Sequence, residues 1–115
     1  MKKIISTIVL VSALIPSLSF ASIDTNLWYG TRGSQVTELQ EFLIDKGFLN
    51  SQPTGNFYSL TLKAVKDFQS ANSLPSTGYI GVLSRAKINQ KLIFEYHKAT
   101  MSKQEFEIYL KHNKK

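Results

Sequence analysis

A repeated stretch of eight residues decides the fold of this 115-residue chain. Its first copy is Thr54-Gly55-Asn56-Phe57-Tyr58-Ser59-Leu60-Thr61, and its second is Thr77-Gly78-Tyr79-Ile80-Gly81-Val82-Leu83-Ser84. Each copy places a Thr-Gly turn ahead of an apolar residue and the start of a helix. Glycine supplies the positive φ that such a turn requires, and we expect the apolar residue behind it to be buried. Because the apolar positions agree as well, the repeat predicts two similar turn-and-helix units.

Apolar spacing around the repeat predicts three amphipathic helices. The first covers residues 34–45, with Ser34 as its expected N-cap and Gly47 as its left-handed C-terminal residue. The second covers residues 59–71, and the third begins near Val82. We expect these helices to bury Val36, Leu39, Leu43, Ala64, Val65, Phe68, Leu83, Ala86 and Ile88. No run alternates as a strand does, so the sequence predicts an all-α fold: a compact three-helix bundle with a short helical C-terminal extension.

The extension covers residues 91–115, after a bundle domain at residues 22–90. Residues 92–96 either continue the third helix or begin a fourth one. Ser102-Lys103-Gln104-Glu105 is a capping box, and an apolar stripe follows it at helical spacing. We expect this final helix to pack its stripe on the bundle, with a membrane-surface or partner helix as the alternative. His97 is interpreted as a surface histidine on a helix.

Residues 1–21 are predicted to be a signal peptide. Lys2 and Lys3 form a short positive region, the following residues to Ile15 are mostly apolar, and Ser19-Phe20-Ala21 places small residues where a signal peptidase reads. We expect cleavage after Ala21 and a secreted or periplasmic product, associated with the cell envelope and without a stable membrane anchor. An uncleaved N-terminal anchor is the alternative.

Composition excludes several kinds of function. Fourteen Lys and Arg against eight Asp and Glu give a net charge of +6, and the chain contains no cysteine. Without cysteine there is no disulfide, no thiol nucleophile and no Cys-ligated metal, and two histidines are too few for most His-based sites. We therefore expect no cofactor and no metal. Because export removes the protein from cytoplasmic nucleic acid, its positive charge favours anionic envelope polymers as partners and argues against nucleic acid.

The order of these motifs resembles that of the peptidoglycan-binding-like domain family. Residues 27–40, LWYGTRGSQVTELQ, are similar to the family's Gly-x-x-Gly turn, its Val and its Leu-Gln pair. Later family positions are matched by Gly55, Phe57, Thr61, Ala64-Val65, Phe68-Gln69, Leu74-Pro75, Gly78 and Gly81. The resemblance covers about residues 27–89. The chain departs from the pattern at Tyr58 and Ser73, where the family usually has glycine, and at Val82, where it often has proline.

The resemblance implies a domain that holds peptidoglycan, or a related cell-wall polymer, without cutting it. We expect its stem peptides, which present carboxylates and amides, to be the part recognised. The candidate ligand-binding residues are Trp28, Tyr29, Arg32, Gln40, Tyr58, Thr61 and Gln69. An arginine near helix N-termini suits a carboxylate, and exposed aromatic rings suit the apolar faces of sugars and peptides.

Structural roles compete with ligand binding at several of these positions. Trp28 could cover a small hydrophobic core, because tryptophan side chains are mostly buried in folded proteins. Gln40 and Gln69 have side chains suited to bonding the backbone of a neighbouring turn, and the hydroxyl of Thr61 lies in a first helical turn where it can satisfy backbone groups. Both interpretations stay open on the sequence alone.

Two other functions compete with cell-wall binding. An envelope protein–protein interaction module would recruit or regulate a separate wall hydrolase or transpeptidase, and Tyr58, Val82 and the extension motivate this alternative. An enzyme is the poorer candidate, and no catalytic residue is predicted. The acidic residues ahead of the extension fall on expected solvent faces or in an end segment, and both histidines lie in the extension, so neither a carboxylate pair nor a Ser-His-Asp site is expected.

Overall fold

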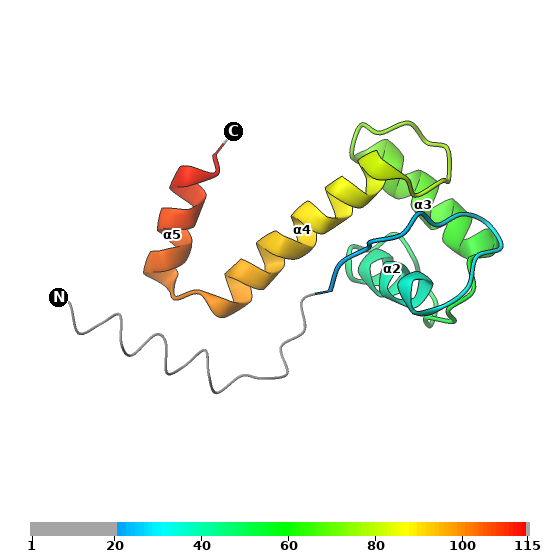
Figure 1. Cartoon of the computed structure of the whole chain (residues 1–115), viewed down its shortest axis with the longest axis horizontal. Helices are drawn as coiled ribbons and strands as arrows, with labels where there is room; N and C mark the ends of the chain where they lie inside the picture. Colours follow the sequence, from blue (N-terminus) through cyan, green and yellow to red (C-terminus); the bar gives the residue numbers. More distant parts are fainter. Residues whose placement is uncertain (1–20, 115) are drawn as a thin grey trace.

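The computed structural model describes residues 21–114, and in this part of the chain all regular structure is helical (Figure 1). The helices are α2 at Ser34–Asp45, α3 at Ser59–Ala71, α4 at Val82–Thr100 and α5 at Lys103–His112. The all-α prediction is confirmed, since extended pairing in the described residues is confined to two isolated antiparallel bridges, Leu27–Ile80 and Arg32–Asn56. The predicted signal peptide, apart from Ala21, lies outside the described residues.

α2 and α3 have the bounds that the sequence predicts. Two positions beyond the end of each helix lies a residue with a left-handed backbone conformation. Gly47 follows α2 with a φ of +83°, and the next N–H group, that of Phe48, donates to the Leu43 carbonyl at 2.8 Å. Ser73 takes the same place after α3 with a φ of +57°, the only positive value for a non-glycine residue in the described chain. This reversal satisfies carbonyls at the helix end, but an L side chain in the left-handed region costs free energy.

The N-terminal ends of α2, α3 and α4 have no side-chain caps. The prediction of Ser34 as the N-cap of α2 is wrong, because Gly33 holds that position and Ser34 is already helical. Tyr58 and Gly81 are the N-caps of α3 and α4. The N–H groups of the first turn of each helix therefore have no side-chain oxygen bonded to them from the N-cap.

The two repeat units contribute equivalent residues to one core. Phe57 and Ile80 are fully buried behind their turns, and Val65 and Ile88 are fully buried further along α3 and α4. The other predicted core positions of α2 and α3 are buried too, namely Val36, Leu39, Leu43, Ala64 and Phe68. One such unit is too small to bury its apolar face alone, so the units stabilise each other through this shared core.

The first turn of α4 corrects the predicted core. Leu83 and Ala86 were expected to be buried, but both are exposed, Leu83 to 63%. Ser84 is buried in their place and accepts a hydrogen bond from the Gln69 amide at 3.1 Å. Leu60, which matches Leu83 in the repeat, is exposed as well. The helix face is therefore set by a polar contact that apolar spacing does not reveal.

The end of α4 and α5 form a helical hairpin, named here the arm (residues 91–114). α4 continues unbroken to Thr100, so residues 92–96 extend the third helix and the helix crosses the boundary expected after residue 90. The predicted capping box is confirmed: Ser102 Oγ accepts from the Glu105 N–H at 3.3 Å, and the Glu105 carboxylate accepts from the Ser102 N–H at 2.9 Å. Within residues 21–114, no helix is long and apolar enough to cross a bilayer.

The arm makes the molecule elongated, and Figure 1 shows α5 separated from α2 and α3 by α4. The radius of gyration is 16.9 Å, whereas a compact domain of this length has about 13 Å. α5 has no buried residue, and aromatic rings hold it to α4: Phe106 lies 5.4 Å from Phe94, and Tyr109 lies 4.5 Å from His97, between ring centroids.

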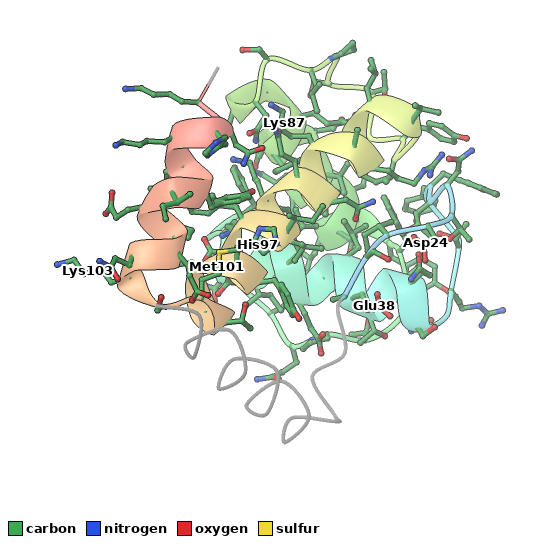
Figure 2. All side chains as sticks on the ribbon, turned by 60° about the vertical axis from the view of Figure 1, so that its left-hand side comes forward. Asp24, Glu38, Lys87, His97, Met101 and Lys103 are labelled. Carbon is green, nitrogen blue, oxygen red and sulfur yellow. The ribbon has the colours of Figure 1, made fainter. Side chains whose placement is uncertain are left out.

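His97 is not the simple surface residue that the sequence suggested. Its ring is partly buried against Tyr109, and its Nδ1 atom is buried without a hydrogen-bond partner in the described chain. Figure 2 shows His97 near the C-terminal end of α4, Met101 at the turn into α5, and Lys103 directed into solvent. The histidine therefore belongs to the contact between the two helices of the arm.

Candidate functional site

The chain just ahead of α2 runs between the two repeat turns and joins them. At one end, Leu27 and Ile80 exchange backbone hydrogen bonds of 3.0 and 2.8 Å. At the other end, the Gly30 N–H donates to the Phe57 carbonyl at 2.7 Å, and the Phe57 N–H donates to the Thr31 carbonyl at 3.0 Å. The turn before α3 and the turn before α4 are thus placed along this one segment.

Exposed aromatic rings and an arginine line this segment. We call them the aromatic surface, and its members are Trp28, Tyr29, Arg32, Tyr58 and Tyr79. The four rings are between 43% and 54% exposed. Trp28 stacks on Tyr79 with centroids 6.1 Å apart and planes at 22°, and Tyr29 contacts Tyr58 at 5.9 Å. Trp28 is therefore half-exposed and not a buried lid on the core.

The charge of this surface comes from Arg32 and the neighbouring helix ends. Arg32 is exposed, its backbone pairs with Asn56 in the turn before α3, and it makes no ion pair with any described residue. The first turns of α2, α3 and α4 contain no acidic residue. Unpaired N–H groups at a helix N-terminus carry partial positive charge, so the surface combines flat apolar area with positive potential.

Gln40 lies inside the bundle and holds the first repeat turn. Its side chain is buried, at 2% exposed. Its Oε1 accepts from the Thr54 and Gly55 N–H groups at 2.8 and 2.9 Å. Its Nε2 donates to the Asn56 carbonyl at 2.9 Å and to Thr61 Oγ1 at 3.0 Å. One amide thus fixes the turn and the first turn of α3 together.

Gln69 does the same for the second repeat turn. Its Oε1 accepts from the Gly78 N–H at 2.8 Å, and its Nε2 donates to the Tyr79 carbonyl at 2.9 Å and to Ser84 Oγ at 3.1 Å. Because the polar atoms of Gln40, Thr61 and Gln69 are buried and used within the protein, the candidate ligand surface excludes these three residues. The alternative interpretation, in which these side chains bond the backbone of neighbouring turns and helix starts, explains their positions.

Four of the seven candidate residues are therefore exposed along or against this segment, namely Trp28, Tyr29, Arg32 and Tyr58, and of these Tyr29 and Tyr58 are in contact. The structure adds Tyr79, which the sequence argument did not single out. Tyr79 follows the turn glycine in the second repeat, where the first repeat has Asn56. An aromatic residue in an exposed turn could have indicated a ligand contact at Tyr79. Its contact with Trp28 could not be predicted, because the two residues are far apart in the sequence.

Two acidic groups of the bundle have close local partners. Asp67 forms an ion pair with Lys63 at 2.7 Å, and Asp24 accepts from the Ser22 hydroxyl at 2.9 Å. Among residues 21–114, no three His, Asp or Glu side chains are grouped closely enough to hold a metal ion.

Known proteins are similar to this chain in both sequence and structure. The family described as "Putative peptidoglycan binding domain" matches residues 32–88. A solved structure titled "The crystal structure of SleB N-terminal domain" shares 32% identical residues at a TM-score of 0.54, and the match covers 70% of this chain and 100% of that chain. No curated protein sequence matches. With its helical fold and the ordered motifs of residues 27–89, the chain belongs to the peptidoglycan-binding domain family.

Proposed function

We propose that this protein is a secreted, non-catalytic module that binds peptidoglycan through the stem peptides. Membership of the peptidoglycan-binding family supports the choice of polymer. The observation that carries the proposal is the aromatic surface, in which the segment that bears two exposed ring pairs also bears Arg32, an exposed arginine that makes no ion pair with residues 21–114. Trp28, Tyr29 and Arg32 precede α2 in the sequence, and Tyr58 and Tyr79 follow it.

Each part of the aromatic surface suits one group of the ligand. The Arg32 guanidinium donates charge-assisted hydrogen bonds to a stem-peptide carboxylate. The stacked pair of Trp28 and Tyr79 offers a flat face to a methyl group or a sugar ring. One shallow site of this kind binds weakly, but peptidoglycan repeats its ligand, so that retention gains from many sites on one polymer.

The start of the bundle at Ile23 is compatible with the proposed cleavage after Ala21. Ile23 is fully buried, and its N–H and carbonyl groups bond to the Asn89 side chain at 2.8 and 3.0 Å. The bundle therefore begins directly after the proposed cleavage site, which leaves the mature chain with an ordered start. N-terminal sequencing of the exported protein tests this, and the expected first residue is Ser22.

Co-sedimentation with purified insoluble peptidoglycan tests the proposed binding. Wild-type protein is expected in the pellet at low salt, and Arg32→Ala should weaken apparent binding about tenfold, the effect of losing one charge-assisted hydrogen bond. The matched control is Lys98→Ala, which removes an exposed positive charge from the arm. Chemical shifts of the aromatic surface should move on addition of a soluble stem-peptide fragment.

Several results would contradict this function. Wild-type protein that stays in the supernatant at low salt would exclude peptidoglycan binding. Equal losses for Arg32→Ala and Lys98→Ala would show that net charge and not the aromatic surface retains the protein. Clearing of peptidoglycan in a zymogram by the purified chain would show that it is an enzyme.

A second function, an envelope protein–protein interaction module, is supported by the arm alone. The arm lies outside the family match at residues 32–88 and extends away from α2 and α3. Such a module would recruit or regulate a separate wall hydrolase or transpeptidase. Deletion of residues 101–115 should then abolish partner capture and leave sedimentation with peptidoglycan unchanged.

A further inference from the structure

A groove with a volume of about 1160 Å³ lies between the arm and the bundle, and none of the residues of the aromatic surface lines it. α4 lines the groove from Ala86 to Glu95. Ala71 at the end of α3 lines it on the bundle side, and Tyr109 on α5 lines it on the arm side. Figure 1 shows this order of helices, with α4 between α3 and α5.

The lining of the groove combines apolar side chains with amides. The apolar members include Phe48, Ile93, Phe94, Tyr109 and Leu110, and the amides are Asn72, Asn89, Gln90 and Asn113. The volume is above the range of about 300–1,000 Å³ usual for small-molecule sites. The stretch of α4 along the groove is about 14 Å long, which equals two to three helical turns. These dimensions suit a short helix lying along α4.

The charge around the groove is positive. Residues 91–115 carry six Lys against three Glu, whereas residues 22–90 carry six Lys and Arg against five Asp and Glu. Two of the three glutamates are already engaged, since Glu95 pairs with Lys46 at 3.3 Å and Glu105 caps α5. Lys91, which lines the groove, makes no ion pair with any described residue. An acidic partner therefore complements this end of the molecule.

We propose that the groove is the docking site for an amphipathic helix of a partner protein, two to three turns long, with an apolar stripe flanked by Asp and Glu. Apolar contacts with the groove supply affinity, and a carboxylate paired with Lys91 supplies orientation. A polyanion without apolar groups would leave the apolar lining unused. A second copy of the chain would bring another arm with a net charge of +3 against the first.

A synthetic peptide tests this docking site on the purified protein. The probe is a fluorescein-labelled amphipathic helix of about 10 residues, close to three turns, with leucines at helical spacing and glutamates beside them. Its counterpart carries lysine at each glutamate position. Fluorescence anisotropy should show binding of the glutamate peptide and at least about tenfold weaker binding of the lysine peptide. Amide shifts on binding should lie in residues 86–95 and 109–113.

Two pairs of variants locate the binding. Ala71→Tyr fills the groove from an exposed position and should weaken peptide binding about tenfold or more, whereas Ser70→Tyr, an exposed neighbour that does not line the groove, should leave it unchanged. Lys91→Glu should weaken binding more than Lys98→Glu, which places the same charge change on α4 outside the groove.

The proposal is overturned if neither peptide binds, or if each matched pair of variants shows equal effects. Sedimentation equilibrium that detects a dimer, dissolved by Ala71→Tyr, would assign the groove to a second copy and overturn it too. Ala71→Tyr should keep full binding to insoluble peptidoglycan, because the groove and the aromatic surface share no residue. If wild-type protein does not bind peptidoglycan, that result would instead contradict the proposed function.

Discussion

α3 and α5 begin in opposite ways, although both are short amphipathic helices. α3 has no side-chain cap, yet it buries Thr61, Ala64, Val65, Phe68 and Gln69. α5 begins with a complete capping box and buries no residue. The bundle helices are therefore held by tertiary contacts, whereas α5 is held by its own local hydrogen bonds and by rings on α4. Helices of the second kind open at a lower free energy than the core does.

This difference in rigidity fits the two roles proposed for the aromatic surface and the groove. The buried amides of Gln40 and Gln69 fix the turns that carry Tyr58 and Tyr79, so the aromatic surface is held rigidly. The groove instead has α5 as one side, and α5 can adjust because few contacts hold it. A rigid surface suits a repeating polymer, and an adjustable groove suits a helix that completes the packing.

Removing a core ring is the strongest way to test the contrast. Phe68 is fully buried, and its ring lies 5.4 Å from Phe42 and 5.6 Å from Phe48. Phe68→Ala should lower the free energy of unfolding by about 3–5 kcal/mol, measured by urea denaturation. Phe106→Ala on α5 should leave the midpoint of the bundle nearly unchanged and reduce helical signal only in the arm. Equal midpoint losses for the two variants would show that the arm and the bundle unfold as one unit.

Replacing the buried glutamines is the next largest change. Gln40→Leu removes the side-chain amide that bonds two N–H groups, a carbonyl and two hydroxyls, and should destabilise the bundle by about 2–3 kcal/mol. Gln69→Leu should cost somewhat less, since the Gln69 Oε1 accepts from one backbone N–H group where the Gln40 Oε1 accepts from two. Thermal unfolding measures both, with exposed Gln90→Leu as the control, expected within about 0.5 kcal/mol of wild type. A smaller effect at Gln40 than at Gln90 would contradict the role assigned to it.

The left-handed residue after α3 offers a stabilising change. Ser73 has a φ of +57°, a conformation that glycine adopts without the steric cost of a side chain. Ser73→Gly should therefore raise the free energy of unfolding by about 1 kcal/mol. Ser70→Gly, the same replacement inside α3, should lower it by about 0.5 kcal/mol. Chemical denaturation distinguishes the two, and a shift of the same sign in both variants would contradict the conformational argument.

The smallest expected effect is a pH dependence confined to the arm. Hydrogen bonds from the Ser102 hydroxyl and backbone hold the pKa of the Glu105 carboxyl below its ordinary value of 4.5. A lowered pKa in the folded helix means that the carboxylate stabilises α5 fully above pH 4.5, and that this contribution is lost as the pH falls through the lower folded value. NMR shifts of α5 should report fraying in that range while the core signals stay unchanged.

The matched control for this pH dependence is Glu105→Gln, which keeps a hydrogen-bond acceptor and cannot ionise. It should remove the pH response of α5 between neutral and acidic pH. Fraying of α5 that is identical in wild type and Glu105→Gln would assign the response to another group.

Much of the fold could be predicted because its signals are local. The ends of α2 and α3 follow from periodicity and from the residues beyond each helix, and the capping box at Ser102 is a four-residue pattern. Exposure was harder to predict: Leu83 has the right spacing for a core residue, yet the hydrogen bond between Gln69 and Ser84 turns the other face of α4 inward. His97 was misjudged for the same reason, because its neighbour Tyr109 lies on a different helix.

The amino-acid sequence by itself determined the extents of α2 and α3 and the start of α5, since turns, caps and apolar spacing act over a few residues. Only the tertiary structure decided which polar side chains are buried and serve the fold and which are exposed and available to a ligand. Gln40 and Arg32 are both polar residues near the first turn, but contacts across the chain bury the first and leave the second exposed. Such contacts depend on how segments distant in the sequence pack together, and a short stretch of sequence does not predict that packing.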